Sequence, residues 1–390
     1  MKYPKILIIS SIIPQNRSAG NILLYRLLQN YPAEKILVIG HESTRWKDED
    51  LLKGVKYCRL ESRVFKLGFT RFSKLVRTVQ IFLPFYKTIN KIRKQTKEFN
   101  PDIILSVMES YSYYYPAFKY AKSKKIPFSL IIHDQPEEFE PVYQPFQKMQ
   151  LRKNATIYNS TISKMNISKQ MELFLRSHYG TKGDVLYPLP SIYLKPRMNI
   201  ENKSLRNINS LTIGYAGTPA YGYGFQLEEM IPVLEKLNSK IRFYGSSLPT
   251  NLKNCKNIEY GGFDSPERTW DKVKEECDSV ILPYTWIEGT YKKLYETHFP
   301  SKLPEYLSLG MPVIVIGPKY ATGVIWAMEN HNDVVSISER NQEEWYTKLK
   351  KLIIDAEYRV ALGKNSLIKR DHFFEPKLIQ EQFLNYINRI

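Results

Sequence analysis

The chain has 390 residues, which exceeds one typical hydrophobic core and favours two domains. Its 3 cysteines form no CxxC pair and no metal-ligand spacing, so we exclude a disulfide or zinc scaffold and expect reduced thiols in a cytoplasmic protein. The net charge of +18 suits nucleic acid or an anionic membrane surface as partner, or reflects a lysine- and asparagine-rich composition alone. Because no RNA-binding aromatic signature, zinc finger or evident helix-turn-helix occurs, we expect no nucleic-acid partner.

The first apolar run, residues 6–13, is short, interrupted by serines and ended by Pro14. It lacks a small-residue cleavage site, so it predicts a buried first strand instead of a signal peptide, and no run in the chain is long enough to span a bilayer. Gly20 and Asn21 follow, before a predicted helix over 22–30. Because glycine lets backbone approach a ligand closely, this turn is either a binding loop or an ordinary strand-to-helix connection.

Residues 63–99 form the most basic stretch, with Glu98 as its single acid and Pro84 interrupting its helical pattern. Apolar residues recur at helical spacing along one face, namely Phe65, Phe69, Phe72, Val76, Val79 and Leu83. One interpretation is an interfacial patch that places basic side chains on anionic headgroups. The other is a helix whose apolar face packs on the sheet while its lysines are solvated.

The remainder of the first half predicts alternating strands and helices. We expect strands over 35–39, 55–60, 102–107, 128–133 and 155–159, and helices over 111–123 and 168–178. His133 and Asp134 close one of these strands, and the carboxyl ends of parallel strands are where α/β folds bind ligands. A histidine there is equally typical of a structural role. The polar, unpatterned residues 195–210 predict a linker.

The second half opens with a strand over 211–215, a glycine loop that includes Gly217 and Thr218, and a helix over 227–237. Backbone N–H groups of such a loop could hold a diphosphate. The glycines do not have the G-x-G-x-x-G spacing, so the pattern disfavours a nicotinamide-dependent dehydrogenase. Further strands are expected over 241–244, 258–262 and 279–283, followed by a long aromatic and charged loop over 285–298.

Residues 299–316 are the most informative segment, and they predict a loop, a helix, a glycine turn and a buried strand. Ser301 and Lys302 stand where the helix begins, so backbone N–H groups and a mobile positive charge favour an anion there. Glu305 lies one turn further and could accept hydrogen bonds from sugar hydroxyls. A phosphate site beside such a carboxylate suits a nucleotide sugar, although an ordinary αβ unit whose glutamate is solvated has the same pattern.

This segment resembles the donor-binding core of family 4 retaining glycosyltransferases, which have the GT-B fold. The resemblance is weak in the N-terminal half and stronger in the C-terminal half. It implies an α/β protein with two Rossmann-like, doubly wound domains that face a cleft, and a C-terminal helix that crosses back to the first domain. The expected parts are an acceptor domain over 1–195, a linker over 196–210, a donor domain over 211–372 and the final helix over 373–390.

The resemblance also assigns roles to particular residues. It implies catalytic roles for His133, Lys302 and Glu305, and an acceptor-side position for Gly20, Asn21 and Asp134. The implied donor-binding residues are Gly217, Thr218, Arg242, Phe263, Tyr284, Ser301, Lys302 and Glu305.

Two departures from the family pattern are visible. Family members carry an Arg and a Lys after the glycine loop, but no basic residue occurs here between Gly217 and Lys236, so Arg242 and Lys302 are the expected substitutes. Family members often have two glutamates with seven residues between them, and Glu305 matches the second. The first would fall on Thr297, which is not acidic, and Glu296 is one residue away. We interpret the second departure as a family variant.

The resulting hypothesis is a retaining glycosyltransferase that moves a sugar from a UDP- or GDP-sugar to a glycan or lipid-linked acceptor in cell-surface polysaccharide or glycolipid assembly. We expect no metal and no resident cofactor. The expected location is cytoplasmic, including the inner face of the plasma membrane through residues 63–99. Two alternatives remain, a sugar-nucleotide epimerase or phosphorylase of similar architecture, and a non-catalytic GT-B protein that binds a membrane or a partner enzyme.

Overall fold

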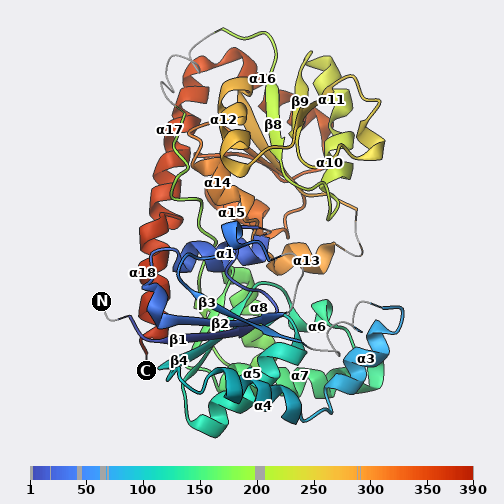
Figure 1. Cartoon of the computed structure of the whole chain (residues 1–390). Helices are drawn as coiled ribbons and strands as arrows, with labels where there is room; N and C mark the ends of the chain where they lie inside the picture. Colours follow the sequence, from blue (N-terminus) through green and yellow to red (C-terminus); the bar gives the residue numbers. More distant parts are fainter. Residues whose placement is uncertain are drawn as a thin grey trace. The chain divides into compact units, whose positions relative to one another are not determined.

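The computed structural model describes residues 3–17, 19–41, 46–61, 67, 70–197, 207–287, 289 and 291–389. The chain divides into two compact units (Figure 1). Unit 1 comprises Met1–Tyr187 and Lys377–Ile390, and unit 2 comprises Pro188–Pro376. Each unit is an α/β structure with its own parallel sheet, so the predicted α/β class with two doubly wound domains is confirmed.

Unit 1 has a seven-stranded sheet in the order β3-β2-β1-β4-β5-β6-β7, and every neighbouring pair is parallel. The strands are β1 (Ile6–Ser10), β2 (Ile36–His41), β3 (Lys56–Leu60), β4 (Ile103–Val107), β5 (Phe128–Ile132), β6 (Ser163–Asn166) and β7 (Asp184–Val185). β1, β4 and β5 are buried along their whole length, as expected for a parallel sheet covered on both faces. The strand order reverses between β1 and β4, which marks the carboxyl edge there as the place for a ligand.

Helices cover this sheet. They are α1 (Ala19–Leu28), α3 (Ser73–Gln80), α4 (Tyr86–Gln95), α5 (Tyr111–Lys124), α6 (Pro136–Phe139), α7 (Gln144–Asn159), α8 (Lys169–Tyr179) and α18 (Pro376–Ile387). α8 begins as predicted, because the Ser168 side chain accepts a hydrogen bond from Met171 N–H, and it ends at Gly180 with φ 81°. α18 is held in unit 1 by hydrogen bonds from Gln380 to the Arg26 carbonyl and from Tyr386 to the Val185 carbonyl.

One predicted strand is wrong. Residues 155–159 are the last turns of α7, and the strand that follows is β6. The sequence of β6, SKMN, is polar enough to resemble a loop, yet pairing with β5 and β7 buries most of it. Tertiary pairing therefore overrides the local preference of both segments.

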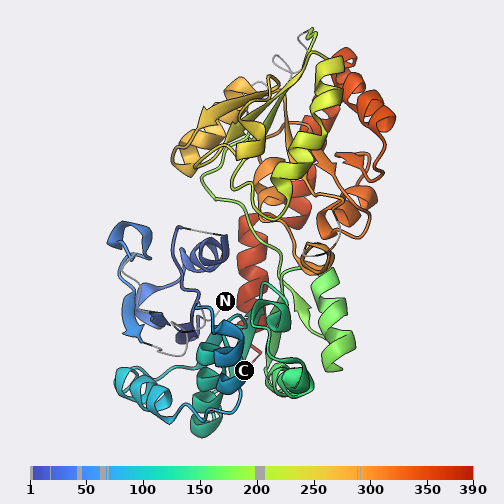
Figure 2. The same cartoon turned by 90° about the vertical axis from the view of Figure 1, so that its right-hand side faces the viewer.

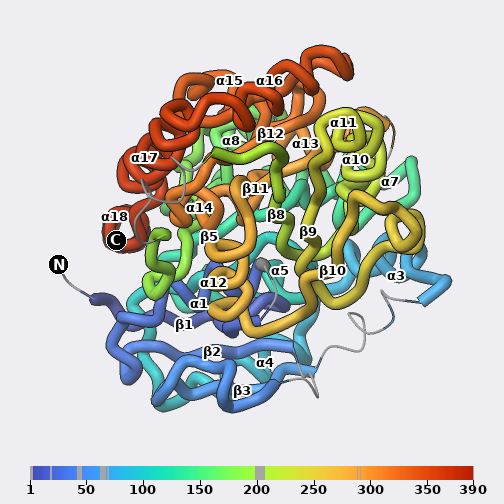
Figure 3. Tube along the Cα trace, turned by 90° about the horizontal axis from the view of Figure 1, so that it is seen from above, coloured from blue at the N-terminus to red at the C-terminus, as the bar shows by residue number. Residues whose placement is uncertain are grey.

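Unit 2 has a six-stranded parallel sheet in the order β10-β9-β8-β11-β12-β13, and Figure 3 shows β8 between β9 and β11. The strands are β8 (Thr212–Ala216), β9 (Lys240–Tyr244), β10 (Ile258–Gly262), β11 (Ser279–Pro283), β12 (Val313–Ile316) and β13 (Val335–Ile337). The order reverses between β8 and β11, so the carboxyl end of β8 is the expected ligand position in this unit.

Helices flank the second sheet on both faces, with α12 on one side and α10 and α11 on the other (Figure 2). They are α10 (Tyr223–Glu229), α11 (Ile231–Lys236), α12 (Pro266–Glu276), α13 (Lys292–Thr297), α14 (Lys302–Leu307), α15 (Thr322–Glu329), α16 (Gln342–Ile354) and α17 (Ala356–Phe373). α13 lies within the segment that the sequence predicts as a long loop. In the part of the chain that the structure describes, none of the helices combines the length and apolarity that crossing a membrane requires.

Candidate functional site

Lys302 and the glycine loop after β8 meet in unit 2. The Lys302 Nζ donates a hydrogen bond to the Tyr215 hydroxyl at 3.0 Å. It also lies 4.8 Å from the centre of the Tyr215 ring and 4.7 Å from that of Tyr223. Tyr215 belongs to β8 and Tyr223 begins α10, so the lysine of α14 is held between two aromatic rings at the predicted ligand edge.

Gly217 gives Lys302 its space. A Cβ added at Gly217 would stand 2.5 Å from Lys302 Cε, closer than real Cβ contacts allow. The Gly217 backbone has φ 127°, a conformation that other residues rarely adopt. Its N–H donates to the Tyr244 carbonyl at 2.8 Å, which fixes the turn to the end of β9. The sequence-predicted pair of Gly217 and Lys302 is thus in direct contact.

The electrostatic state of Lys302 follows from its surroundings. Burial lowers the pKa of the ammonium group from its usual 10.5 to about 7. Among the described residues, the ammonium group makes its hydrogen bond and its ring contacts with tyrosines, and the two aromatic faces replace only part of the lost hydration. An arriving anion would restore the charged form. The side chain therefore suits the binding of phosphate better than a permanent ion pair.

α14 is anchored to the central strand by Tyr306, whose hydroxyl accepts a hydrogen bond from Ala216 N–H at 3.0 Å. This helix has only six residues, so few peptide dipoles align at Ser301, and the charge of Lys302 must supply most of the field. Ser301 is exposed. Glu305 is buried and follows Lys302 by three residues, which places both on one helix face.

Tyr284 directly follows the carboxyl end of β11, and its side chain is fully buried. Its ring meets those of Tyr295 at 4.8 Å and Tyr223 at 6.0 Å, both edge to face. Gly323 leaves room for the Tyr284 hydroxyl, since a Cβ there would come within 2.3 Å of it. Tyr284 is therefore linked to Lys302 through Tyr223 and belongs to the same aromatic cluster.

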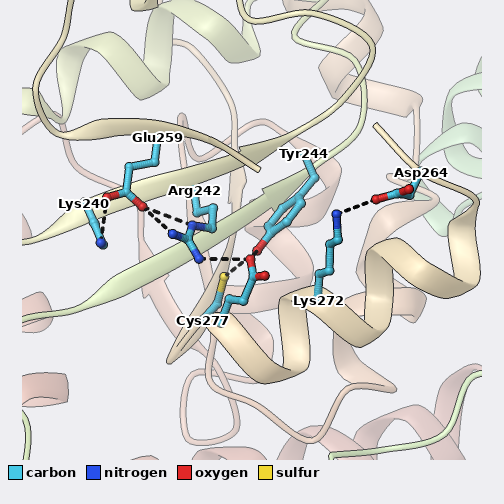
Figure 4. Close-up of polar contacts among 8 residues, drawn as sticks. Lys240, Arg242, Tyr244, Glu259, Asp264, Lys272 and Cys277 are labelled. Atoms are coloured by element: carbon cyan, nitrogen blue, oxygen red, sulfur yellow. Dashed lines mark hydrogen bonds and ion pairs between the residues drawn. The ribbon is translucent and has the colours of Figure 1, made fainter. Parts of the chain in front are cut away.

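Arg242 lies in a different group of contacts (Figure 4). Its guanidinium donates to Glu259 at 2.8 Å and to Glu276 at 3.0 Å, while the Tyr244 hydroxyl donates to the same Glu276 at 2.7 Å. Side chains alternate along β9, and the intervening Phe243 stacks on Tyr215 on the Lys302 side. The structure therefore holds Arg242 on the other face of the sheet, and its donor role stays a prediction.

The last two donor predictions lie at the surface of unit 2. Phe263 follows β10 and is 71% exposed. Thr218 is also exposed, and its carbonyl accepts a hydrogen bond from the Tyr215 hydroxyl, which ties it to the Lys302 contacts. Thr218 thus joins Gly217 and Lys302 in one group, whereas the contacts found for Phe263 do not place it there.

In unit 1, the predicted acceptor-side residues gather at the carboxyl edge of β1, β4 and β5. A Cβ added at Gly20 would lie 3.2 Å from Nδ1 of His133, so the turn before α1 packs on that ring. His133 is buried and directly follows β5, and Asp134 comes next in the chain. Asn21 sits in the first turn of α1, where its carbonyl accepts a hydrogen bond from Gln15 N–H.

Glu109 is a residue of this edge that the sequence analysis missed. It follows β4 by two residues, and its carboxylate accepts a hydrogen bond from Ser11, just beyond β1, at 2.6 Å. Burial raises its pKa from 4.5 to about 7, and the charges of Asp134 and Glu140 add to the rise. The carboxyl can therefore hold or release a proton near neutral pH. The strand-end argument applied to His133 would have found it.

No protein-family model matches the chain, and no curated protein sequence matches it. Solved structures do resemble it. HepE from Anabaena, crystallised with UDP and glucose, aligns with a TM-score of 0.70 at 14% identity over 99% of this chain and 100% of HepE. Sucrose-phosphate synthase from Thermosynechococcus elongatus aligns with a TM-score of 0.68 at 13% identity over 98% of each chain.

TarM of S. aureus is a third structure of this kind, with a TM-score of 0.66 at 11% identity over 99% of both chains. At such low identities, the likeness establishes the architecture and leaves the chemistry to the residues of this chain. Nearly the whole chain is covered in all three alignments, including both sheets. The chain has the GT-B fold.

Proposed function

We propose that the protein is a glycosyltransferase that uses a nucleoside diphosphate sugar, with UDP or GDP as the leaving group. The observation that carries this proposal is the contact of Lys302 with the Gly217 turn at the carboxyl end of β8. HepE, of the same fold, was crystallised with UDP and with UDP-glucose, which supports a nucleotide sugar as ligand.

The proposed chemistry requires that negative charge on the departing diphosphate be stabilised. Lys302 would supply the stabilising positive charge, because a diphosphate beside it favours the ammonium form. Glu305 would accept hydrogen bonds from the ribose hydroxyls. We assign the diphosphate to Lys302 and not to Arg242, because two carboxylates already neutralise that guanidinium.

On the acceptor side, His133 would orient a sugar hydroxyl, and Glu109 would exchange a proton with the acceptor near neutral pH. The resemblance to family 4 enzymes supports retention of configuration, without a protein nucleophile and without a metal or resident cofactor. It also supports a glycan or lipid-linked acceptor in polysaccharide or glycolipid assembly, used in the cytoplasm at the inner face of the plasma membrane.

The test is turnover of a panel of nucleotide sugars, with release of free UDP or GDP as the readout. We expect release with at least one donor and a loss of about a hundredfold or more in Lys302→Ala, as for other groups that stabilise a leaving charge. Lys319→Ala is the matched control, since Lys319 is an exposed lysine of the same unit. Absence of release with every donor would favour the non-catalytic alternative, and full activity of Lys302→Ala would remove this lysine from the mechanism.

A further inference from the structure

α3 presents its apolar side to solvent. Phe72, Leu75, Val79, Phe82 and Tyr86 are between 47% and 72% exposed. Phe72, Leu75 and Val79 recur at steps of three and four residues on α3 and its N-cap, and Phe82 and Tyr86 follow the helix in the chain. A surface helix normally buries such a stripe, but in α3 the buried residues are polar. We call these five residues the α3 stripe.

Hydrogen bonds hold α3 in this orientation. The Thr78 hydroxyl accepts from Tyr143 N–H at 3.0 Å, and Gln80 donates to the carboxylate of Glu140 at 3.0 Å. Both polar side chains are buried, so rotating the stripe inward would break these bonds and move Thr78 and Gln80 away from their partners. The exposure of the stripe is therefore specified by the fold.

The chain segment that carries the stripe has charges of one sign. Residues 70–97 contain 8 lysines and arginines and no aspartate or glutamate. Arg71 and Lys74 are exposed beside the stripe, with the Arg71 guanidinium 4.8 Å above the Phe72 ring, and Lys87 and Lys91 are exposed on α4. Long basic side chains can reach anionic headgroups while neighbouring apolar groups enter the acyl boundary.

The surroundings of α3 favour a bilayer over a groove-binding partner. α3 lies at the periphery of unit 1 in Figure 1, and its apolar side chains are about half exposed. Phe139 and Tyr143, both more than a third exposed, continue the apolar surface beside it. An exposed apolar surface whose charged neighbours are mostly basic, with Glu138 as the exposed acid beside Phe139, matches the acyl boundary and headgroups of an anionic leaflet.

We propose that the α3 stripe inserts into an anionic bilayer and holds unit 1 at the membrane surface. The link to catalysis rests on the proposed function. Glu140, which accepts the bond from Gln80, also accepts bonds from Ser110 at 3.0 Å and from Tyr111 N–H at 2.8 Å. One buried carboxylate therefore joins α3 to the residue that follows Glu109, so membrane docking would bring the acceptor edge close to a lipid-carried substrate.

The experiment is sedimentation of the full chain with vesicles of phosphatidylcholine containing roughly 30% phosphatidylserine, compared with pure phosphatidylcholine. We expect binding to the anionic vesicles and roughly tenfold or greater loss in the double variant Leu75→Ser, Val79→Ser, since each loses an inserted apolar group. The matched control is Ile354→Ser, Ile368→Ser, two exposed aliphatic residues of unit 2, which should bind as the unaltered protein does.

Equal binding by the α3 variant, or no binding to anionic vesicles, would overturn the proposal. Lipid-free self-association that the α3 variant abolishes, without vesicle binding, would instead identify a second copy as the occupant and would also overturn it. Release of UDP or GDP is measured on the same samples. Vesicle binding without turnover would refute the proposed function alone, and turnover without vesicle binding would refute this inference alone.

Discussion

Binding of a nucleotide sugar should draw a proton onto Lys302. Burial lowers the pKa of this lysine to about 7 in the free protein, and a diphosphate beside it would raise the pKa again. The bound state then holds more protons than the free state at every pH between the two pKa values. Affinity is therefore fully present well below the free pKa of about 7 and falls as the pH rises through 7 toward the pKa of the complex.

The size of the effect follows from the free pKa of about 7. Near pH 6 about 0.1 proton should be taken up, near pH 7 about 0.5, and near pH 8.5 close to one. The apparent dissociation constant should rise by about 30-fold between about pH 6 and pH 8.5, which is roughly 2 kcal/mol of binding free energy.

Titration calorimetry in buffers with different ionisation enthalpies measures this proton uptake directly. The ligand is the nucleotide sugar that supports turnover, whose diphosphate has no proton to lose in this range. Lys302→Arg is the control, because a guanidinium remains charged and should show no uptake. Absence of uptake near pH 8.5 in the unaltered protein, or equal uptake in the arginine variant, would refute the assignment of the diphosphate to Lys302.

Three further predictions concern other residues. Gly217→Ala should weaken nucleotide-sugar binding at least tenfold, because the added Cβ collides with Lys302. Gly262→Ala is the control, since Gly262 has φ 92° and open space around it. Calorimetry of this control should show unchanged binding and only the backbone cost of about 1 kcal/mol in stability. Glu109→Gln should be more stable than the unaltered protein above about pH 7, by up to about 3 kcal/mol, and equally stable below about pH 4.5. The reason is that burial penalises the folded carboxylate, which forms only at the higher pH. If the two proteins have equal urea midpoints at both pH values, this prediction is contradicted. Arg242→Gln should lower stability by about 1 kcal/mol, since its ion pairs are partly exposed, and leave the Kd for the nucleotide sugar within about twofold.

The fold was predictable because its central strands are continuous apolar runs. β1 and β12 are buried at every position, so their sequences indicate strands covered on both faces without further information. β6 could not be found in this way, because its polar residues are buried by pairing with strands that lie elsewhere in the chain. The mistaken strand at 155–159 arose from a local preference that the packing of α7 overrides.

The candidate site was predictable where its residues stand at turns that the sequence itself marks. Gly217 follows a predicted strand and Lys302 begins a predicted helix, and both were expected to bind the donor. The roles of Tyr215 and Tyr223 were not predictable, because only the folded structure brings their rings to the same ammonium group. The α3 stripe shows a related limit: helical spacing identifies an apolar face but does not say whether that face turns inward.

The contrast between Lys302 and Arg242 supports the proposal that one lysine serves where family 4 glycosyltransferases carry a basic pair after the glycine loop. Two carboxylates already neutralise the guanidinium, so a diphosphate would have to compete with them. Lys302 lies between tyrosine rings, and no carboxylate pairs with it among the described residues. In such surroundings a charge interacts more strongly with an arriving anion than an exposed pair would in water. The burial of one lysine can thus compensate for a smaller number of positive charges at the diphosphate. Because burial also lowers the pKa of that lysine, binding then depends on pH.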